Sequence, residues 1–193
     1  IEANAILIEY NNDIATVRHN ITSEYFDVNV NGADVEIISE ASIEGLQYYL
    51  SGTTTNGSFS LESDMPYEVI LNNTEITSLT NVPLNLSKNV ERNIIIANGT
   101  TNILSDSEDS DGKAVINSKG ATNISGFGSL TINANKKHGI SSDNDINIDG
   151  ATISINHSAD ASKGLKSDSN IMITDGDVTI VSSGTLTLEA LDL

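Results

Sequence analysis

The stretch KKHGISSDNDINIDGATISI, residues 136–155, is followed by a near copy of itself, SKGLKSDSNIMITDGDVTI, residues 162–180. With His138-Gly139-Ile140 as the anchor, Lys163-Gly164-Leu165 occurs 25 residues later. The same offset relates further pairs: Ser142 and Ser167, Asp143 and Asp168, Ile146 and Ile171, Ile148 and Ile173, Ile153 and Val178, and Ile155 and Ile180. Apolar positions that recur at a fixed period, with free variation between them, are typical of a repeat whose copies share one core.

The repeat extends toward the N-terminus with a slightly shorter period. Ile116 and Ile124 precede Ile140 and Ile148 by 24 residues, and the Gly-rich turn at 125–129 can absorb a one-residue change of period. More degenerate copies are expected at 35–37, 68–73 and 87–96, and an incomplete last copy is expected at 186–188. These copies predict about six or seven coils.

Each copy contains short segments in which apolar and polar residues alternate, such as Ile146-Asn147-Ile148 and Ile153-Ser154-Ile155. A period of two is typical of β-strands, and Asp149-Gly150 between these segments is typical of a tight turn. No helical pattern is long enough to connect the segments as βαβ units. The sequence therefore predicts an all-β parallel β-helix, a single-stranded solenoid in which each coil hydrogen-bonds to the next. An antiparallel β-sandwich also uses many short strands, but it does not require the same residues at a fixed period.

The ends of such a solenoid need a cover, because an open coil exposes its core and its backbone hydrogen-bonding groups. We expect residues 1–34 to form an N-terminal cap and residues 35–193 to form one continuous β-helix domain. The ending LTLEALDL, residues 186–193, is short for a C-terminal cap, so we expect the chain to be part of a longer protein.

Composition excludes some classes of function. The chain of 193 residues has a formal charge of −18, with 27 acidic and 9 basic side chains, and no cysteine. Such a surface repels nucleic-acid phosphates, so we expect no nucleic-acid binding. No apolar run approaches the roughly 18 residues of a membrane span, so we expect no membrane insertion. The acidity favours bound cations, although solubility alone also explains it.

Four segments, in this order, resemble one protein family: NVNGADVEIISEASIEGLQYYLSG, EVILNNTEITS, SKNVERNIIIANGTTNILSDSEDSDGKAVINSKG and GFGSLTINANKKHGISSDNDINIDGATISI. They resemble the bacterial secreted carbohydrate-binding domain family over about residues 20–185. The resemblance implies a pectate-lyase-like right-handed parallel β-helix, located outside the bacterial cell or on its surface. It also implies calcium on the helix and non-catalytic binding of plant-type polysaccharide, especially polygalacturonate.

The sequence departs from that family just before the Gly-Ile dipeptide of each coil, where members often carry an Asp. Here His138 and Lys163 occupy these positions. A neutral or cationic group thus replaces a calcium ligand that the resemblance would imply.

Asp143, Asp145 and Asp168 form a first candidate calcium group, with Asn144 and Asn170 nearby. In a parallel β-helix Asp143 and Asp168 lie one strand spacing apart, about 4.8 Å. Two carboxylates at this distance repel each other unless a cation lies between them, and calcium accepts carboxylate, carbonyl, Asn and water oxygens. Alternatively, these residues cap exposed turns by bonding local N–H groups.

The acidic loop SDSEDSDGK, residues 105–113, is a second candidate calcium group. Its possible ligands are Asp106, Glu108, Asp109 and Asp111. The loop lacks the spacing and the closing Glu of an EF-hand. The alternative is a solvated surface loop without a metal.

Basic residues form the candidate ligand-binding group, because five lysines and a histidine gather around one turn column. The residues predicted to bind ligand are Lys119, His138, Lys163 and Lys166, with Lys136 and Lys137 nearby. Lysines beside calcium can hold the carboxylates of a uronate polymer. The alternative is that they only balance the charge of the neighbouring aspartates.

We therefore expect calcium-assisted, non-catalytic binding of an acidic plant-type polysaccharide by a monomeric module. One alternative is a structural or adhesive stalk with structural calcium. Another is a uronate lyase, in which Lys163 or Lys166 would remove the C5 proton. Aromatic residues are few, and alternation points only one of Tyr48 and Tyr49 outward, which disfavours binding of crystalline cellulose.

Overall fold

The computed structural model describes residues 2–40, 42–159 and 162–183, and these form strands and turns without a helix. None of them forms a helix long and apolar enough to cross a membrane. The first eight strands are β1 (Ala5–Asn11), β2 (Ile14–His19), β3 (Phe26–Asn31), β4 (Asp34–Ser39), β5 (Leu46–Thr54), β6 (Ser58–Ser63), β7 (Tyr67–Thr77) and β8 (Leu84–Ser87). The others are β9 (Arg92–Ile96), β10 (Thr101–Ser105), β11 (Ala114–Ser118), β12 (Thr122–Gly126), β13 (Ser129–Ala134), β14 (His138–Ser142), β15 (Ile146–Asp149), β16 (Thr152–His157), β17 (Leu165–Ser167), β18 (Ile171–Ile173) and β19 (Asp177–Ser182).

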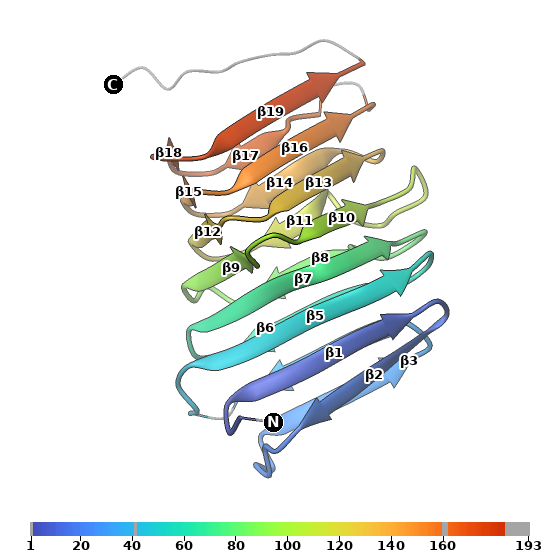
Figure 1. Ribbon diagram of the computed structural model, residues 1–193, viewed down its shortest axis with the longest axis vertical. Coiled ribbons are helices and arrows are strands. Elements are labelled where there is room, and N and C mark those ends of the chain that lie inside the picture. The colour runs from blue at the N-terminus through green and yellow to red at the C-terminus, as the bar shows by residue number, and fades with distance from the viewer. Residues whose placement is uncertain (1, 41, 160–161, 184–193) are drawn as a thin grey trace.

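These strands stack as rungs along the long axis of the molecule, in two sheets (Figure 1). The larger, 12-stranded sheet runs β18-β15-β12-β9-β7-β10-β13-β16-β19, and β5 joins β7 to β1. The smaller, 7-stranded sheet runs β17-β14-β11-β8-β6-β4-β3. Between the described strands every pairing is parallel except β1 with β2 and β3 with β4, which confirms the predicted parallel β-helix.

The register between coils confirms the sequence repeat. Its paired positions include Ile116 with Ile140, Ile124 with Ile148, Leu130 with Ile153, Ile140 with Leu165, Ile146 with Ile171, and Ile155 with Ile180. The earlier copy at 87–96 begins with Ser87-Lys88, which resembles Ser118-Lys119. Its register is shifted by one residue, since Ser118 pairs with Leu86 and not with Ser87. The turn after β8 differs from the later turns, because Lys88 adopts a positive φ of 71°. The copy expected at 186–188 and the ending at 186–193 lie outside the described residues.

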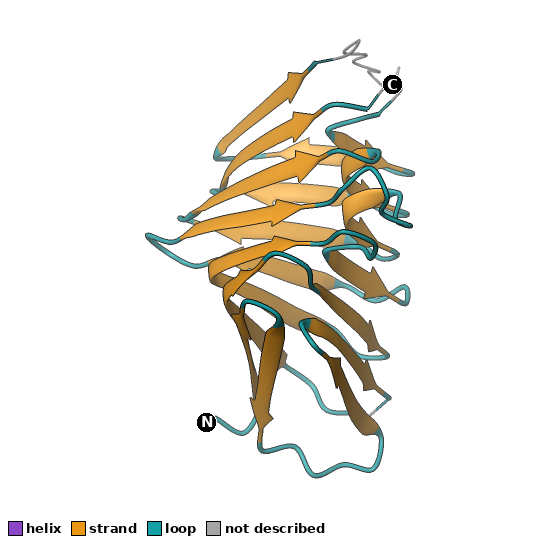
Figure 2. Ribbon diagram, turned by 90° about the vertical axis from the view of Figure 1, so that its right-hand side faces the viewer, coloured by secondary structure: helices purple, strands orange, loops and turns teal. Residues whose placement is uncertain are grey.

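The N-terminal region, where a cap is expected, combines parallel and antiparallel strands. Strand β1 lies parallel to β5 and so continues the larger sheet, whereas β2 folds back antiparallel onto β1. Strand β3 pairs antiparallel with β4 at the end of the smaller sheet. The two hairpins thus lie at the N-terminal end of the stack of coils (Figure 2).

The cross-section of the coil changes along the axis. The long strand β7 pairs with both β9 and β10, which are separate strands of the next coil. The break between such strands is a turn, and at Gly126 this turn needs a glycine. Its φ is 110°, and a Cβ there would lie 2.1 Å from the carbonyl oxygen of Ile96. Early coils therefore contain one long and one short strand, and later coils contain three short strands.

Columns of apolar side chains fill the inside of the coils. One column contains Val69, Ile94, Ile124 and Ile148, which pair in register and are fully buried. Burial of each such side chain stabilises the fold by about 1.5–3 kcal/mol. Each coil depends on its neighbours, because a single coil cannot enclose these side chains.

Rows of asparagine side chains run along the outside of all three faces of the later coils. Asn123 donates to Asn93 at 3.1 Å, and Asn147 donates to Asn123 at 2.9 Å. The other two faces carry Asn117 bonded to Asn85 at 2.9 Å and Asn156 bonded to Asn133 at 3.0 Å. Each amide thus satisfies its neighbour one coil away and helps to hold the coils in register.

Arg92 interrupts an inward column that otherwise holds Leu46, Tyr67, Thr122 and Ile146. Its side chain is completely buried and, within the part of the chain that the structure describes, has no carboxylate partner. The guanidinium instead donates to three carbonyl groups and one hydroxyl: Leu86 O at 2.9 Å, Lys88 O at 2.7 Å, Val90 O at 2.6 Å and Ser118 Oγ at 2.6 Å. It also lies 5.6 Å from the ring centroid of Tyr67. Arg92 therefore fastens the turn between β8 and β9 to the core.

We expect Arg92→Met to lower the free energy of unfolding by about 3–5 kcal/mol, because it leaves several buried acceptors without a donor. Arg92→Lys should recover only part of the loss, since an ammonium cannot span four acceptors in a planar fork. Urea unfolding measures the free energy of unfolding of both variants. The control is Arg18→Met, which removes an exposed ion pair to Glu9 and should cost no more than about 1 kcal/mol. Equal losses for Arg92→Met and Arg18→Met would contradict this role.

Candidate functional site

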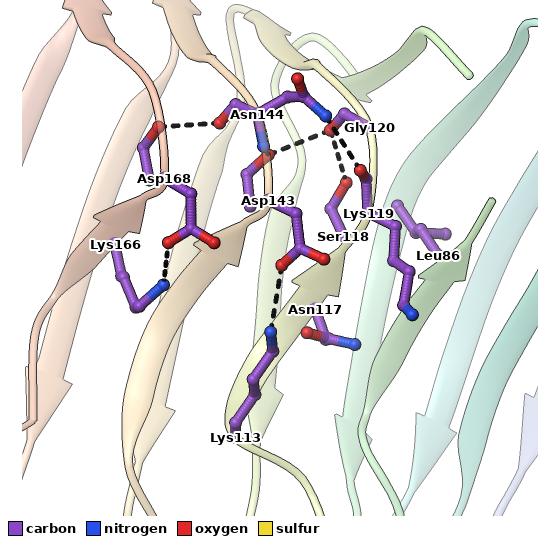
Figure 3. Close-up of polar contacts among 12 residues, drawn as sticks. Leu86, Lys113, Asn117, Ser118, Lys119, Gly120, Asp143, Asn144, Lys166 and Asp168 are labelled. Atoms are coloured by element: carbon purple, nitrogen blue, oxygen red, sulfur yellow. Dashed lines mark hydrogen bonds and ion pairs between the residues drawn. The ribbon is translucent and has the colours of Figure 1, made fainter. Parts of the chain in front are cut away.

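The predicted charged column lies where strands of the smaller sheet turn toward the larger sheet, after β11, β14 and β17. Ser118 pairs with Ser142, and Ser142 with Ser167. The next residue of each later coil continues this order, because the N–H of Asp143 bonds Ser118 O at 3.0 Å and that of Asp168 bonds Ser142 O at 3.1 Å. Asp143 and Asp168 therefore occupy neighbouring positions of one turn column (Figure 3).

The serine of each Ser-Asp pair shapes the turn. Ser142 Oγ donates to Gly120 O at 3.0 Å and accepts from the N–H of Asn144 at 3.1 Å. Ser167 Oγ repeats this pattern, donating to Asn144 O at 2.7 Å and accepting from the N–H of Ser169 at 2.9 Å. A hydroxyl that bonds the N–H two residues onward is a common turn device. The recurrence of serine is thus explained by local structure, which leaves the function of the aspartates to be explained.

Each aspartate of the column is paired with a lysine. Lys113 Nζ lies 3.1 Å from Asp143 Oδ1, and Lys166 Nζ bonds Asp168 Oδ1 (Figure 3). The bond from Lys166 also holds the pKa of Asp168 below its usual range. In both pairs the lysine contacts Oδ1, so Oδ2 of each carboxylate remains for another ligand. The column therefore presents alternating positive and negative groups.

Asp145, the third member of the first predicted calcium group, bridges two coils. Its Oδ1 accepts from the backbone N–H of Asn170 at 3.0 Å and from Asn170 Nδ2 at 3.2 Å. Hydrogen bonds from the Ser169 hydroxyl and from Asn170 lower the pKa of Asp145. This arrangement matches the turn-capping alternative for this residue.

The members of the second predicted calcium group lie in different environments. Asp106 is almost completely buried, and its Oδ1 accepts from the N–H groups of Asn135 at 2.5 Å and Lys136 at 3.2 Å. Burial raises the pKa of this carboxyl. The other members, Glu108, Asp109 and Asp111, are exposed on the loop that follows. Among the described residues, no three His, Cys, Asp or Glu side chains form a group suited to hold a metal ion.

The predicted ligand-binding residues differ in their accessibility. Lys119 is exposed, and the side chain of Lys166 is 28% exposed. His138 is buried, and its Nδ1 accepts from the backbone N–H of Lys163 at 3.0 Å. Burial, followed by the nearby positive charges, lowers the pKa of His138 to about 4. A neutral His138 thus joins two coils beneath the basic surface.

Lys113 was missed in the sequence, although a signal for it exists. The offset of 24 residues that maps Ile116 onto Ile140 also maps Lys113 onto Lys137. An exposed aromatic side chain was missed as well, since Phe127 is 78% exposed. Of the two neighbouring tyrosines, Tyr48 is fully buried and Tyr49 lies on the outer face, as alternation predicted.

Comparison with known proteins identifies the family. A model of carbohydrate-binding domain-containing proteins matches residues 31–190. The chain belongs to this carbohydrate-binding domain family. A carbohydrate-binding domain-containing protein of Acetivibrio thermocellus is 29% identical over 141 residues, which are 66% of this chain and 49% of the relative. The chain thus spans about half the length of that relative.

A solved structure shares the fold. The polysaccharide lyase-like protein from C. thermocellum, solved as a gadolinium derivative, superposes with a TM-score of 0.67 at 20% identity. The match covers 93% of this chain and 92% of that one. At this identity the likeness establishes the parallel β-helix of the family and nothing about its chemistry.

We expect the stability of the protein to fall between about pH 6.5 and pH 4 because of His138. An unfolded histidine takes up a proton near pH 6.5, whereas the folded one does so only at about 4. The contribution is therefore fully present above pH 6.5 and is lost as the pH falls toward 4, by roughly 3 kcal/mol in all.

Urea unfolding at the two ends of this window tests the role of His138. The variant His138→Asn keeps an acceptor for the N–H of Lys163 but cannot titrate, so its loss of stability with pH should be smaller than that of the parent protein. The difference between the two pH values is the readout, which removes any constant cost of the substitution. An unchanged pH dependence in His138→Asn would show that other groups cause it.

Proposed function

We propose that this carbohydrate-binding domain binds acidic polysaccharide at the turn column formed by Lys113, Lys119, Asp143, Lys166 and Asp168. The observation that carries the proposal is the stacking of lysine–aspartate pairs in successive coils of a chain with a net charge of −18. In an acidic surface, these lysines give a polyanion several cations along one line. The lysines would hold the carboxylates of a uronate polymer, one coil after another.

Calcium is the proposed partner of the carboxylates in this column. Oδ2 of Asp143 and of Asp168 would supply two oxygens from neighbouring coils, and uronate carboxylates and water would supply the rest. Such an ion would neutralise the repulsion between the protein and a polyanion. The residues present fit an ion shared with the ligand better than an ion enclosed by protein, because each aspartate already bonds a lysine through Oδ1.

The proposed role is binding without catalysis, on a protein exported to the outside of the cell or to its surface. A lyase would need a lysine free to remove the C5 proton, and Lys166 is held by Asp168. Lyase activity is the second candidate function, because Lys166 lies beside carboxylates that could share a calcium ion with a uronate. It predicts an unsaturated product that absorbs ultraviolet light.

Retention on immobilised polygalacturonate, in calcium and then in chelator, tests the proposal. We expect retention in calcium only. The variants Lys166→Met and Asp168→Asn should each bind polygalacturonate more weakly than the parent protein, by about fivefold or more. Arg18→Met, which removes a cation from an exposed ion pair on β2, should bind as the parent protein does.

Three outcomes would contradict the proposal in different ways. Absence of retention in both buffers would exclude polygalacturonate as the ligand and favour a stalk. Equal weakening by Arg18→Met would show attraction by overall charge and not by the column. Growth of ultraviolet absorbance during incubation with polygalacturonate would show lyase activity.

A further inference from the structure

The outer face of the larger sheet carries an apolar stripe across four successive strands. Leu7 on β1 pairs with Tyr49 on β5, Tyr49 with Ile70 on β7, and Ile70 with Ile95 on β9. These side chains point to the outer face of the sheet, because the residues that flank each of them belong to the core: Ile6, Ile8, Tyr48, Leu50, Val69, Leu71, Ile94 and Ile96. Leu7, Tyr49 and Ile95 are half-buried, whereas Ile70 is only 7% exposed. We call this outward-facing, largely half-buried row the apolar stripe.

A row of hydrogen-bonding side chains borders the apolar stripe. It consists of Gln47, Glu68 and Asn93, which pair in register on β5, β7 and β9. Gln47 Nε2 donates to Glu68 Oε2 at 2.7 Å, and the Tyr49 hydroxyl donates to Gln47 Oε1 at 3.0 Å. These bonds fix the phenol ring beside a carboxylate. An apolar surface with a polar rim is typical of an interaction site.

The rim leads into an acidic hollow of about 490 Å³. Its lining includes Glu44, Met65, Pro66, Glu68, Glu91 and Asn93. The charges of Glu44, Glu68 and Glu91 thus gather at one edge of the apolar stripe. Beyond the other edge, Glu9 on β1 forms an ion pair with Arg18. The face therefore repels polyanions, in contrast to the lysine–aspartate column.

We propose that the apolar stripe and its acidic hollow bind a cationic polysaccharide, a polymer of amino sugars. The sugar rings would lie across the strands with their C–H faces on Tyr49 and Ile95, and their ammonium groups would face Glu68 and the hollow. The stripe advances by one strand spacing, about 4.8 Å, from residue to residue, which is close to the length of one pyranose ring. This site is separate from the column proposed for polyuronate and takes a ligand of opposite charge.

Charge complementarity decides between this ligand and others of similar shape. A neutral glycan would bring no positive charge to the three glutamates of the hollow, which are hydrogen-bonded only to neutral amides where the structure pairs them. A basic peptide would match their charge, but it has no continuous flat face to cover the apolar stripe. An amino-sugar polymer offers both a flat apolar face and a cation on each ring.

Calorimetric titration with a glucosamine hexamer, at physiological ionic strength, tests the proposal. We expect binding that weakens about fivefold in Glu68→Gln and about tenfold in Tyr49→Ala. The matched control is Glu36→Gln, which removes one exposed carboxylate from β4 in the smaller sheet and should change binding by less than about twofold. The N-acetylated hexamer, which has the same backbone without charge, should bind at least tenfold more weakly.

Several results would overturn the proposal. Equal affinity for the N-acetylated hexamer would identify a neutral-glycan site. Equal affinity for a lysine hexamer, with no effect of Tyr49→Ala, would show that charge alone drives binding. Equal weakening by Glu36→Gln would place the ligand elsewhere. Retention of Glu68→Gln on polygalacturonate is measured in parallel, so failure of this face is distinguished from failure of the polyuronate column.

Discussion

The parallel stacking of coils at a spacing of about 4.8 Å is the constraint on which the rest of the structure depends. It places equivalent residues of successive coils side by side, so each position of the repeat becomes a column along the axis. A column is stable only if its side chains attract one another or all lie in an environment, the core or water, that matches their polarity. Inside, isoleucine, leucine and valine meet this condition by burial. Outside, asparagine meets it by donating to its own kind one coil away. At the turns, Asp143 and Asp168 meet it with a lysine beside each, and Asp145 meets it by accepting from Asn170 of the next coil.

Arg92 is a charged exception among the inward columns. Its column holds Leu46 and Tyr67 before it and Thr122 and Ile146 after it, and the step from Arg92 to Thr122 is the longest between paired positions in that column. Much of the additional length lies in the acidic loop between β10 and β11. The guanidinium fits the core because carbonyl groups of the end of β8 and of the turn between β8 and β9 converge on it. A buried charge is tolerated here because backbone dipoles replace the water that it loses.

The repeat made much of the fold predictable, since register in a parallel β-helix follows from the period of the apolar residues. The pairing of Ile146 with Ile171 follows directly from that period. The chemistry at the turns was less predictable, because it depends on how each loop folds. Nothing in the local sequence around Asp106 indicates that this carboxylate is buried while Glu108 is exposed. The pairing of Lys113 with Asp143 likewise depends on the path of the loop that precedes β11.

The charge of the whole chain is a poor guide to its ligands, because the solenoid sorts charge by face. Side chains of one column are neighbours over several coils, so even a few substitutions at one position of the repeat create a strip of distinct potential. The lysines gather along one turn column, whereas Glu44, Glu68 and Glu91 gather around a hollow at the edge of the larger sheet. A polymer that runs along the axis meets one such strip for its whole bound length. Selection between polysaccharides by a β-helix of this kind would therefore depend on which strip the polymer follows, and the two binding sites proposed above would select polymers of opposite charge.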